Sequence, residues 1–380
     1  MAKTALVVGG TGPTGPYIVN GLLQRGFEVA ILHRGSHEVD EIPPEVEHIH
    51  TDPYDYDSLL LALSSRHFDI CIATYGRLRA IAEVMASRCE RFLSAGGGPA
   101  YRGYMNPALY GAGGMPVPVR ENHTLVEEEA EDSKGWRIVR TERALFKEIP
   151  HATHFRYPYV YGRYQLVPRE WLLVRRFRDG RRRIILPDGG LTLHSFGYAE
   201  NIAHAILLAV DKPAVSRGKI YNVADDTVLT LRQVTDIIAA HMGVEVEVIN
   251  MPWELAVPAR PLVMQPQTSH RVQDVSALRH DLGYSDKVAP PQALRATVDW
   301  LLANPPLPGG TEEMVLEDPF DYAAEDRLID AWLAACRTLP AWDGTTEPGL
   351  GMAYSGPGGR ARSQAEFAQP DATGQPDREA

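Results

Sequence analysis

The sequence predicts an α/β fold in which a doubly wound parallel sheet carries a smaller second α/β lobe. Short apolar runs alternate with helical stretches from the first residues onward, and this alternation is typical of βαβ units with parallel strands. A glycine-rich segment joins the first predicted strand to the first predicted helix. The chain has 380 residues, of which 44% are hydrophobic and 23% charged, so it can bury a full core.

The elements of the first half follow from their local patterns. Runs rich in β-branched and aromatic residues predict strands at 4–8, 28–33, 46–49, 68–74, 91–94 and 153–160. Helical stretches between them predict helices at 17–24, 57–64, 78–88 and 136–147. The segment 96–133 is rich in glycine and proline and ends in an acidic run, which predicts a long loop over the sheet edge.

The second half has a mixed pattern, and this mixture predicts the smaller lobe. Helices are expected at 171–177, 201–210 and 231–241, with a strand at 184–186. Residues 320–336 predict one or two amphipathic helices. The stretch from about 347 is rich in Gly, Pro, Ser, Ala and Gln, a composition typical of disorder.

The segment after the first strand has the features of a phosphate-binding loop. Its glycines follow the spacing G-x-x-G-x-x-G and open a helix. Glycines let the backbone turn tightly and approach a pyrophosphate, while the free N–H groups and dipole of the helix stabilise the anion. The sequence therefore predicts a Rossmann-type dinucleotide site. Its expected cofactor contacts are Gly9, Thr11, Gly12, Pro13, Thr14 and Gly15.

The residues after the second strand favour NADP(H) over NAD(H). Arg34 and Ser36 lie where an NAD-specific site usually has an acidic residue for the ribose 2′-hydroxyl. A guanidinium suits a 2′-phosphate, although a solvated loop arginine is the competing interpretation. Asp52 is either a partner of the adenine amino group or an exposed turn residue before Pro53. Further cofactor contacts are expected at the strand ends Thr74, Tyr75, Ser94 and Pro158.

These patterns predict four regions along the chain. Residues 1–165 are expected to form the dinucleotide-binding domain, to which strands near 190–225 return. A substrate lobe at 166–310 and C-terminal helices at 311–345 follow. The remaining residues, 346–380, are expected to be a disordered tail.

Several further motifs occur in the order of a known family. The segments Arg156-Tyr157-Pro158-Tyr159-Val160-Tyr161-Gly162, Lys219-Ile220-Tyr221-Asn222-Val223 and Asp274-Val275-Ser276 are similar to landmarks of the extended short-chain dehydrogenase/reductase superfamily. This group contains NAD-dependent nucleotide-sugar epimerases, dehydratases and related reductases. The resemblance covers roughly 4–302 and implies a Rossmann-type fold and a nicotinamide cofactor.

The family's catalytic residues are missing from their usual positions. The resemblance places Gly97 where a Ser or Thr hydroxyl is normal, and no Y-x-x-x-K occurs in the chain. Either Trp136 and Arg140 or Lys134 and Ile138 replace the Tyr–Lys pair. The sequence therefore resembles atypical branches that keep the cofactor fold and lose or replace the triad. Some members of those branches are reductases with other proton donors, and others are sensors or RNA-associated proteins.

Three side chains are candidates for a replacement proton donor. Tyr101 is the first choice, because it matches the family's Tyr-Gly landmark, and Tyr104 is the second. His194 is the third candidate, since imidazole titrates near neutral pH. Packing of the aromatic rings between the two lobes is the alternative for each tyrosine.

Six arginines between 175 and 183 form the one strongly basic run. They could clamp a phosphate, a carboxylate or a nucleotide-sugar pyrophosphate. A solvated helix face explains them equally well.

The most favoured function is an NADP(H)-dependent oxidoreductase that acts on a small carbonyl or alcohol through a non-standard proton donor. The first alternative is a nucleotide-sugar epimerase or dehydratase that retains NAD(P). The second is a non-catalytic NAD(P)-binding sensor or scaffold.

The charge and composition of the chain limit which binding partners and which location are expected. The net charge of −11 argues against a broad nucleic-acid surface or an anionic membrane as partner, so the expected partner is a small-molecule substrate, with a homodimer left open. The first residues lack the pattern of a secretory signal, and no apolar run reaches membrane-spanning length, which predicts a cytoplasmic protein. The three cysteines have no zinc-ligand spacing, and no metal site is predicted.

Overall fold

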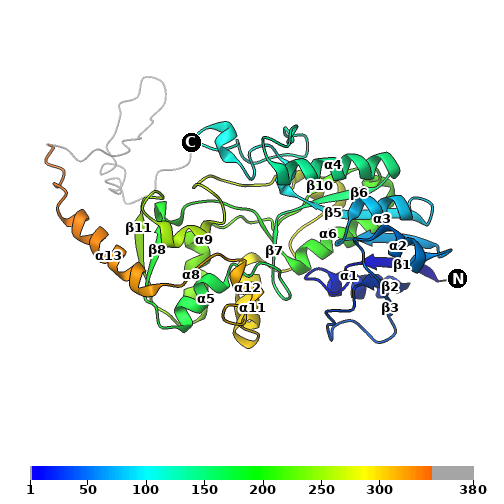
Figure 1. The fold of residues 1–380 in the computed structure, drawn as a ribbon, viewed down its shortest axis with the longest axis horizontal. Helices are drawn as coiled ribbons and strands as arrows, with labels where there is room; N and C mark the ends of the chain where they lie inside the picture. Colours follow the sequence, from blue (N-terminus) through cyan, green and yellow to red (C-terminus); the bar gives the residue numbers. More distant parts are fainter. Residues whose placement is uncertain (1, 345–380) are drawn as a thin grey trace, which may run out of the picture. The chain divides into compact units, whose positions relative to one another are not determined.

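The computed structural model describes residues 2–344, and the predicted tail at 346–380 lies outside them. Seven parallel strands form the central sheet in the order β10-β6-β5-β4-β1-β2-β3 (Figure 1). The predicted parallel α/β sheet is confirmed. The strands are β1 (Lys3–Val8), β2 (Phe27–His33), β3 (Glu47–His50), β4 (Phe68–Ala73), β5 (Cys89–Gly97), β6 (Thr153–Tyr157) and β10 (Ile220–Asn222).

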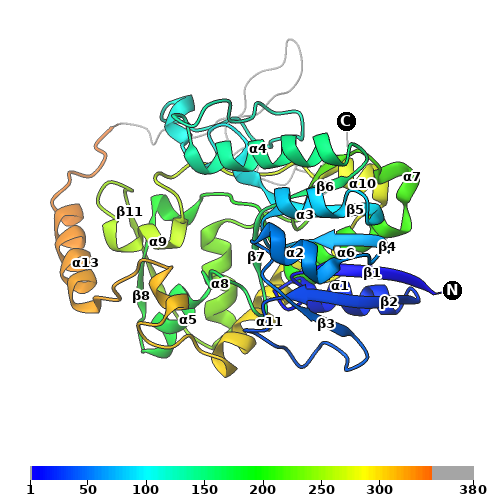
Figure 2. The same cartoon turned by 45° about the vertical axis from the view of Figure 1, so that its right-hand side comes forward.

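Helices cover both faces of the sheet, which is why its central strands are almost continuously apolar (Figure 2). Adjacent residues of β2 show the alternation, because Ile31 packs with Ile18 on one face and Leu32 packs with Ile81 on the other. The first face carries α1 (Gly15–Leu23) and α6 (Ala199–Asp211). The second carries α2 (Tyr56–Leu63), α3 (Leu78–Met85) and α4 (Ser133–Glu148).

The strand order reverses between β1 and β4, since β1 leads to β2 on one side while β4 and β5 extend the sheet on the other. In open α/β sheets the crevice outside the carboxyl ends at such a point is where ligands bind. The glycine loop, Tyr75 after β4 and Gly98 after β5 lie at this edge.

The predicted strand at 153–160 is two strands in the structure. β6 pairs inside the main sheet, whereas β7 (Tyr159–Tyr161) pairs with β9 (Phe196–Tyr198) in a separate two-stranded sheet. The break falls at Pro158, which has no N–H to donate to a neighbouring strand.

The second lobe is built on a short parallel pair, β8 (Arg183–Pro187) and β11 (Glu247–Met251). β11 was not among the predicted strands; it has five residues, of which Val248, Ile249 and Met251 are apolar. The other α-helices within residues 2–344 are α5 (Trp171–Arg178), α7 (Pro213–Ser216), α8 (Leu231–His241), α9 (Arg260–Val263), α10 (Ser276–Leu282), α11 (Pro290–Ala303), α12 (Thr311–Met314) and α13 (Tyr322–Arg337).

Residues 2–326 form one compact unit, and residues 327–344 belong to a second unit, which contains most of α13. Within residues 2–344 there is no helix with both the length and the apolar character needed to cross a bilayer.

Candidate functional site

The glycine loop between β1 and α1 is fixed by the space available around its backbone. Gly9 has φ +93°, and its N–H donates to the carbonyl of Leu32 over 3.0 Å. A Cβ at Gly9 would lie 2.4 Å from Tyr75 Cβ, and a Cβ at Gly15 would lie 2.1 Å from the Gly10 carbonyl oxygen. Both positions therefore require glycine for the loop itself to form.

Gly12 differs from Gly9 and Gly15, because the space that a side chain would occupy there is open. A Cβ there would approach only the Gly9 carbonyl oxygen, at 3.7 Å. The helix start beside it has no side-chain cap from Thr14, although the Gly15 N–H donates to the Gly12 carbonyl over 2.9 Å. The positive end of the α1 dipole and the open backbone at Gly12 fit a pyrophosphate.

A buried hydroxyl borders this loop. Tyr157, at the end of β6, has a hydroxyl that lacks a hydrogen-bond partner among the described residues. Burial raises its pKa, and the nearby Thr14 hydroxyl opposes that rise. This buried phenol next to a phosphate-type loop offers a polar group to a ligand at this edge.

The residues predicted to bind a 2′-phosphate lie in the loop that follows β2. Arg34 is exposed after β2, and its guanidinium carbon is 5.8 Å from the centre of the Tyr75 ring. Ser36 is exposed two residues later. Asp52 accepts a 2.9 Å hydrogen bond from the N–H of Tyr54, which is the geometry of the turn aspartate weighed as its alternative role.

The remaining expected cofactor contacts are bonded or packed within the protein. The Thr74 hydroxyl donates to the Val8 carbonyl at 3.2 Å. Ser94 is 2% exposed, and its hydroxyl lies 2.8 Å from His154 Nδ1, so its position does not support a cofactor contact. Pro158 is buried at the break between β6 and β7.

A cavity of about 380 Å³ lies at the ends of β4 and β5, next to Gly97, which the resemblance aligns with the missing hydroxyl. Gly97 has no side chain to supply a hydroxyl, and a Cβ there would lie 3.1 Å from Pro99 Cδ and 3.8 Å from Ile138 Cδ1. Lys134 and Ile138 line the cavity, whereas Trp136 packs beneath Arg140. Of the two alternative pairs, α4 therefore presents Lys134 and Ile138 to this edge. Four basic side chains line the cavity: Arg77, Arg79, Lys134 and Arg137.

Tyr101, the first-choice proton donor, is enclosed and fully bonded. It is 0% exposed, and its hydroxyl donates to Asn222 Oδ1 at 2.5 Å. The guanidinium carbon of Arg156 lies 4.8 Å from the centre of its ring. Burial raises its pKa to about 12, against the lowering effect of Arg156. A phenol held in this way ties chain segments together and is poorly placed to protonate a substrate.

The structure brings Tyr104 and His194 together. The Tyr104 hydroxyl lies 3.3 Å from His194 Nε2, and the Tyr104 ring lies 2.9 Å from where a Cβ at Gly98 would be. The pair therefore stands directly beyond β5. Burial lowers the pKa of His194 well below its ordinary value, and the charges of Arg271 and Arg169 add to this effect. His194 is neutral as a result, and its Nδ1 lacks a partner among the described residues.

Two buried arginines surround this pair. The Arg271 guanidinium lies 4.8 Å from the Tyr104 ring centre, and its Nε and Nη2 have no hydrogen-bond partner within residues 2–344. Arg169 is stacked 3.6 Å from the Phe196 ring centre and is paired with Glu170 at 3.3 Å. A 1% exposed guanidinium without a carboxylate is costly, so the lobe interface favours an anionic group near Arg271.

A buried polar network that was not predicted from the sequence borders the cavity, which Glu142 and His154 line. Glu142 pairs with Arg156 at 2.8 Å and lies 3.4 Å from His154, which contacts Ser94. Burial opposes the ionisation of Glu142, but His154 and Arg156 outweigh it and lower its pKa to about 2. The only signal in the sequence was an acidic residue on the inner face of an amphipathic helix.

The arginine run is used mainly inside the fold. Arg176 pairs with Asp318 at 2.8 Å and with Glu325 at 2.5 Å, and both carboxylates are buried. Arg175 pairs with Glu313 at 2.5 Å, and Arg181 with Asp326 at 2.7 Å. The three arginines therefore pair with carboxylates inside the protein. This pairing argues against both earlier interpretations of the run, a solvated helix face and a clamp for a phosphate.

Four potential metal ligands lie together at a place where the sequence predicted no metal site. His33, Glu38, His48 and His50 place one ligand atom each within 4.8 Å of one another. The H-x-H pattern at 48–50 beside a strand ending in histidine was the signal that could have found them.

The parallel sheet and the glycine loop after its first strand together define a Rossmann-type α/β fold. No protein-family model matches the chain. UDP-glucose 4-epimerase from Thermotoga maritima, solved with UDP-glucose, is similar with a TM-score of 0.63 and 17% identity over 79% of this chain and 99% of that one. dTDP-glucose 4,6-dehydratase from Bacillus anthracis, solved with NAD, has a TM-score of 0.60 and 16% identity over 80% of this chain and 98% of that one. The fold is thus that of the NAD-dependent epimerases and dehydratases, as the resemblance implies.

Among curated sequences, the chain is similar to the chloroplast stem-loop binding protein of 41 kDa b from Arabidopsis thaliana. The two are 25% identical over 242 residues, which is 60% of this chain and 60% of the relative. The chain spans no more than 60% of the length of the curated relatives that it matches.

Proposed function

We propose that this protein is an atypical extended short-chain dehydrogenase/reductase that binds NADP(H) and interconverts a small carbonyl compound and its alcohol. The single observation that carries the proposal is the contrast within the glycine loop. Gly9 and Gly15 are required by the packing of the loop, whereas Gly12 is open on the side where a pyrophosphate would lie. A bound nicotinamide would supply or accept the hydride, and the protein would orient the substrate and move a proton.

Turnover of the cofactor tests this proposal directly. Purified protein is mixed with NADPH and a panel of aldehydes, ketones and keto acids, and the absorbance of the reduced nicotinamide is followed. Oxidation that depends on both protein and carbonyl supports the oxidoreductase. Tight cofactor binding with no oxidation across the panel would count against it.

Arg34 is the expected determinant of cofactor choice. Arg34→Ala should weaken NADP(H) binding about 10- to 100-fold, because a charge-assisted contact to the 2′-phosphate contributes about 1.5–3 kcal/mol. Binding of NAD(H), which lacks that phosphate, should barely change. Calorimetric titration with both cofactors measures the difference, and an equal loss for both would show that Arg34 does not read the 2′-phosphate.

The Tyr104–His194 pair is our choice of proton donor in place of Tyr101. Both members are buried, and the cavity beside His194 is only about 20 Å³, so a substrate would reach them when the interface between the lobes opens. In the direction of carbonyl reduction, the Tyr104 hydroxyl would give its proton to the developing alkoxide, and the phenolate left behind would regain a proton from water. Neutral His194 would hold the Tyr104 oxygen in place through Nε2.

Paired Tyr→Phe substitutions separate the two tyrosines. Tyr104→Phe should lower kcat about 100- to 10,000-fold with cofactor affinity unchanged, because one proton-transfer group is lost. Tyr101→Phe should mainly lower the melting temperature, since its hydroxyl bonds Asn222. If Tyr101→Phe abolishes turnover and Tyr104→Phe does not, the assignment is reversed.

The unpaired Arg271 points to a substrate that carries a carboxylate or phosphate. The four basic side chains of the 380 Å³ cavity support the same preference. Anionic carbonyl compounds should therefore outperform neutral analogues of the same size in the carbonyl panel.

An epimerase or dehydratase that retains its cofactor is the second candidate, favoured by the solved structures of similar fold. Such an enzyme should purify with oxidised cofactor that is released only on denaturation. Cofactor that exchanges freely in dialysis favours the reductase instead.

A non-catalytic role is the third candidate, favoured by the curated relative named for stem-loop binding. The net charge of −11 and the internal pairing of the arginine run argue against a similar RNA surface here.

A further inference from the structure

Three histidines share one face of the sheet edge. β2 and β3 pair in parallel with His33 directly opposite His50. His48 lies two residues before His50, and side chains at i and i+2 point to the same face of a strand. The register therefore gathers three imidazoles that the sequence separates by up to 17 residues.

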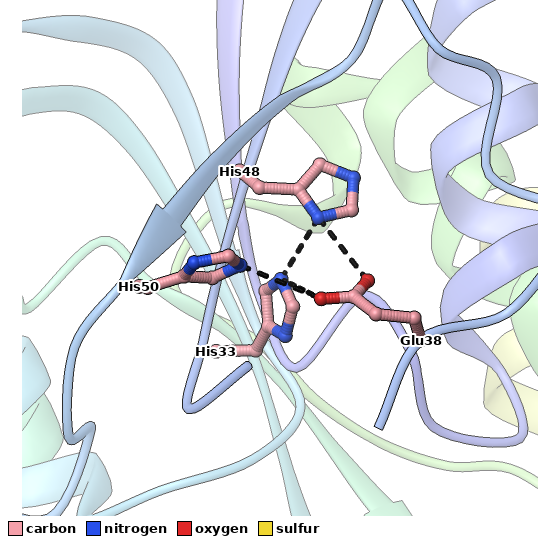
Figure 3. A group of neighbouring side chains, drawn as sticks. All are labelled: His33, Glu38, His48 and His50. Carbon is pink, nitrogen blue, oxygen red and sulfur yellow. Dashed lines mark hydrogen bonds and ion pairs between the residues drawn. The ribbon is translucent and has the colours of Figure 1, made fainter. Parts of the chain in front are cut away.

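The loop after β2 adds a carboxylate to them. Val39 and Ile42 of this loop are buried in the same apolar cluster as Ile31, which holds the loop over that face. Glu38 lies next to Val39 and turns its carboxylate toward all three rings (Figure 3). Its oxygens are 3.7 Å from His33 Nε2, 3.2 Å from His48 Nδ1 and 3.4 Å from His50 Nε2.

These separations match a tetrahedral coordination shell. A zinc ion with bonds of about 2.0–2.1 Å to nitrogen or oxygen places neighbouring ligand atoms about 3.3 Å apart. His33 Nε2 and His48 Nδ1 are 3.1 Å apart, and the four ligand atoms all lie within 4.8 Å of one another. We propose that His33, Glu38, His48 and His50 form a binding site for a tetrahedral divalent metal ion, with zinc as the best match.

The burial gradient suits such a site. His33 is 5% exposed in its side chain and anchors the inner end, while Glu38 at 49% and His50 at 56% leave an entry path from solvent. Imidazole nitrogens with one carboxylate are ligands that zinc accepts, and hard ions such as Mg²⁺ and Ca²⁺ prefer all-oxygen shells.

Metal binding would change one hydrogen bond of the loop. The Gly35 N–H donates to His33 Nδ1 over 3.3 Å. A metal on Nε2 requires the hydrogen on Nδ1, so this long bond is given up and the Gly35 N–H becomes available to another acceptor. The ion would then tie the loop that carries Arg34 and Ser36 to the edge strand through Glu38.

Zinc titration of the full chain tests the site without any enzymatic readout. The protein is prepared without a histidine tag, stripped with a chelator and titrated against a chromophoric zinc indicator. We expect one zinc ion per chain that outcompetes the indicator, and a higher melting temperature with zinc than without. Cobalt(II) in place of zinc should give the intense visible absorption of a tetrahedral site, and the weak bands of an octahedral ion would overturn the proposed geometry.

Matched variants locate the ion. His48→Gln and Glu38→Gln should each weaken zinc binding by more than about 10-fold, because even outer-shell partners of a metal contribute about 10- to 100-fold. His67→Gln removes an exposed histidine outside the cluster and should leave binding unchanged. Equal affinity in the wild type and both cluster variants would overturn the proposal, as would a wild type that binds no zinc. None of these measurements depends on cofactor turnover. The zinc site can therefore be confirmed or rejected independently of the proposed function.

Discussion

Gly12→Ala should leave the protein folded and remove most of its cofactor affinity. The added Cβ meets only one protein atom within 4 Å, the Gly9 carbonyl oxygen at 3.7 Å, so the native loop accepts it. The same methyl group occupies the space through which a pyrophosphate would approach the backbone. A tight contact of this kind costs about 1–3 kcal/mol, which corresponds to about 10- to 100-fold in affinity.

Calorimetry and thermal unfolding together measure this result. The melting temperature of Gly12→Ala should stay near that of the wild type while cofactor binding falls. Gly15→Ala is the contrasting variant, because its Cβ would lie 2.1 Å from the Gly10 carbonyl oxygen and should destabilise the fold itself. Unchanged cofactor affinity in a folded Gly12→Ala protein would place the pyrophosphate elsewhere.

Glu142→Gln should be the most destabilising conservative substitution of a charged residue near the site. The change leaves Arg156, which is 1% exposed, without its carboxylate. Removing one partner of a buried ion pair costs about 3–5 kcal/mol. Glu47→Gln is the matched control, since Glu47 also pairs with an arginine, Arg66, but at the exposed surface, where about 1 kcal/mol or less is expected.

The destabilisation by Glu142→Gln should also depend on pH. The folded-state pKa of Glu142 is about 2, below the ordinary value of 4.5, so the carboxylate stabilises the fold fully above about pH 4.5. That contribution is lost as the pH falls from about 4.5 toward 2. Denaturant unfolding at several pH values should show a wild-type advantage that shrinks over this window. A constant difference would mean that the charge of Glu142 is not what stabilises the fold.

Local patterns were sufficient to predict the sheet and the glycine loop. The strands ending at Val8, His33 and Ala73 are apolar runs bounded by turn residues, and the loop glycines lie in seven consecutive positions. Pro158 was overlooked as a strand break, because the residues on both sides of it still favour an extended backbone.

The rest of the candidate site depends on contacts between distant parts of the chain. Tyr104 and His194 are 90 residues apart and meet only because the second lobe returns to β5. The burial of Tyr101 follows from the long loop folding back on itself, where Tyr101 forms a bridge with Leu125. The metal-ligand cluster requires the register of β2 and β3, which the sequence does not encode in any one segment.

The hydrogen bond from Tyr101 to Asn222 joins residues 121 positions apart, and Asn222 ends the outermost strand of the sheet. A fragment cut after residue 165 would therefore lack an edge strand and leave a buried phenol with no acceptor. During synthesis, the part of the chain that forms the seven-stranded sheet cannot complete its own interior until β10 has left the ribosome.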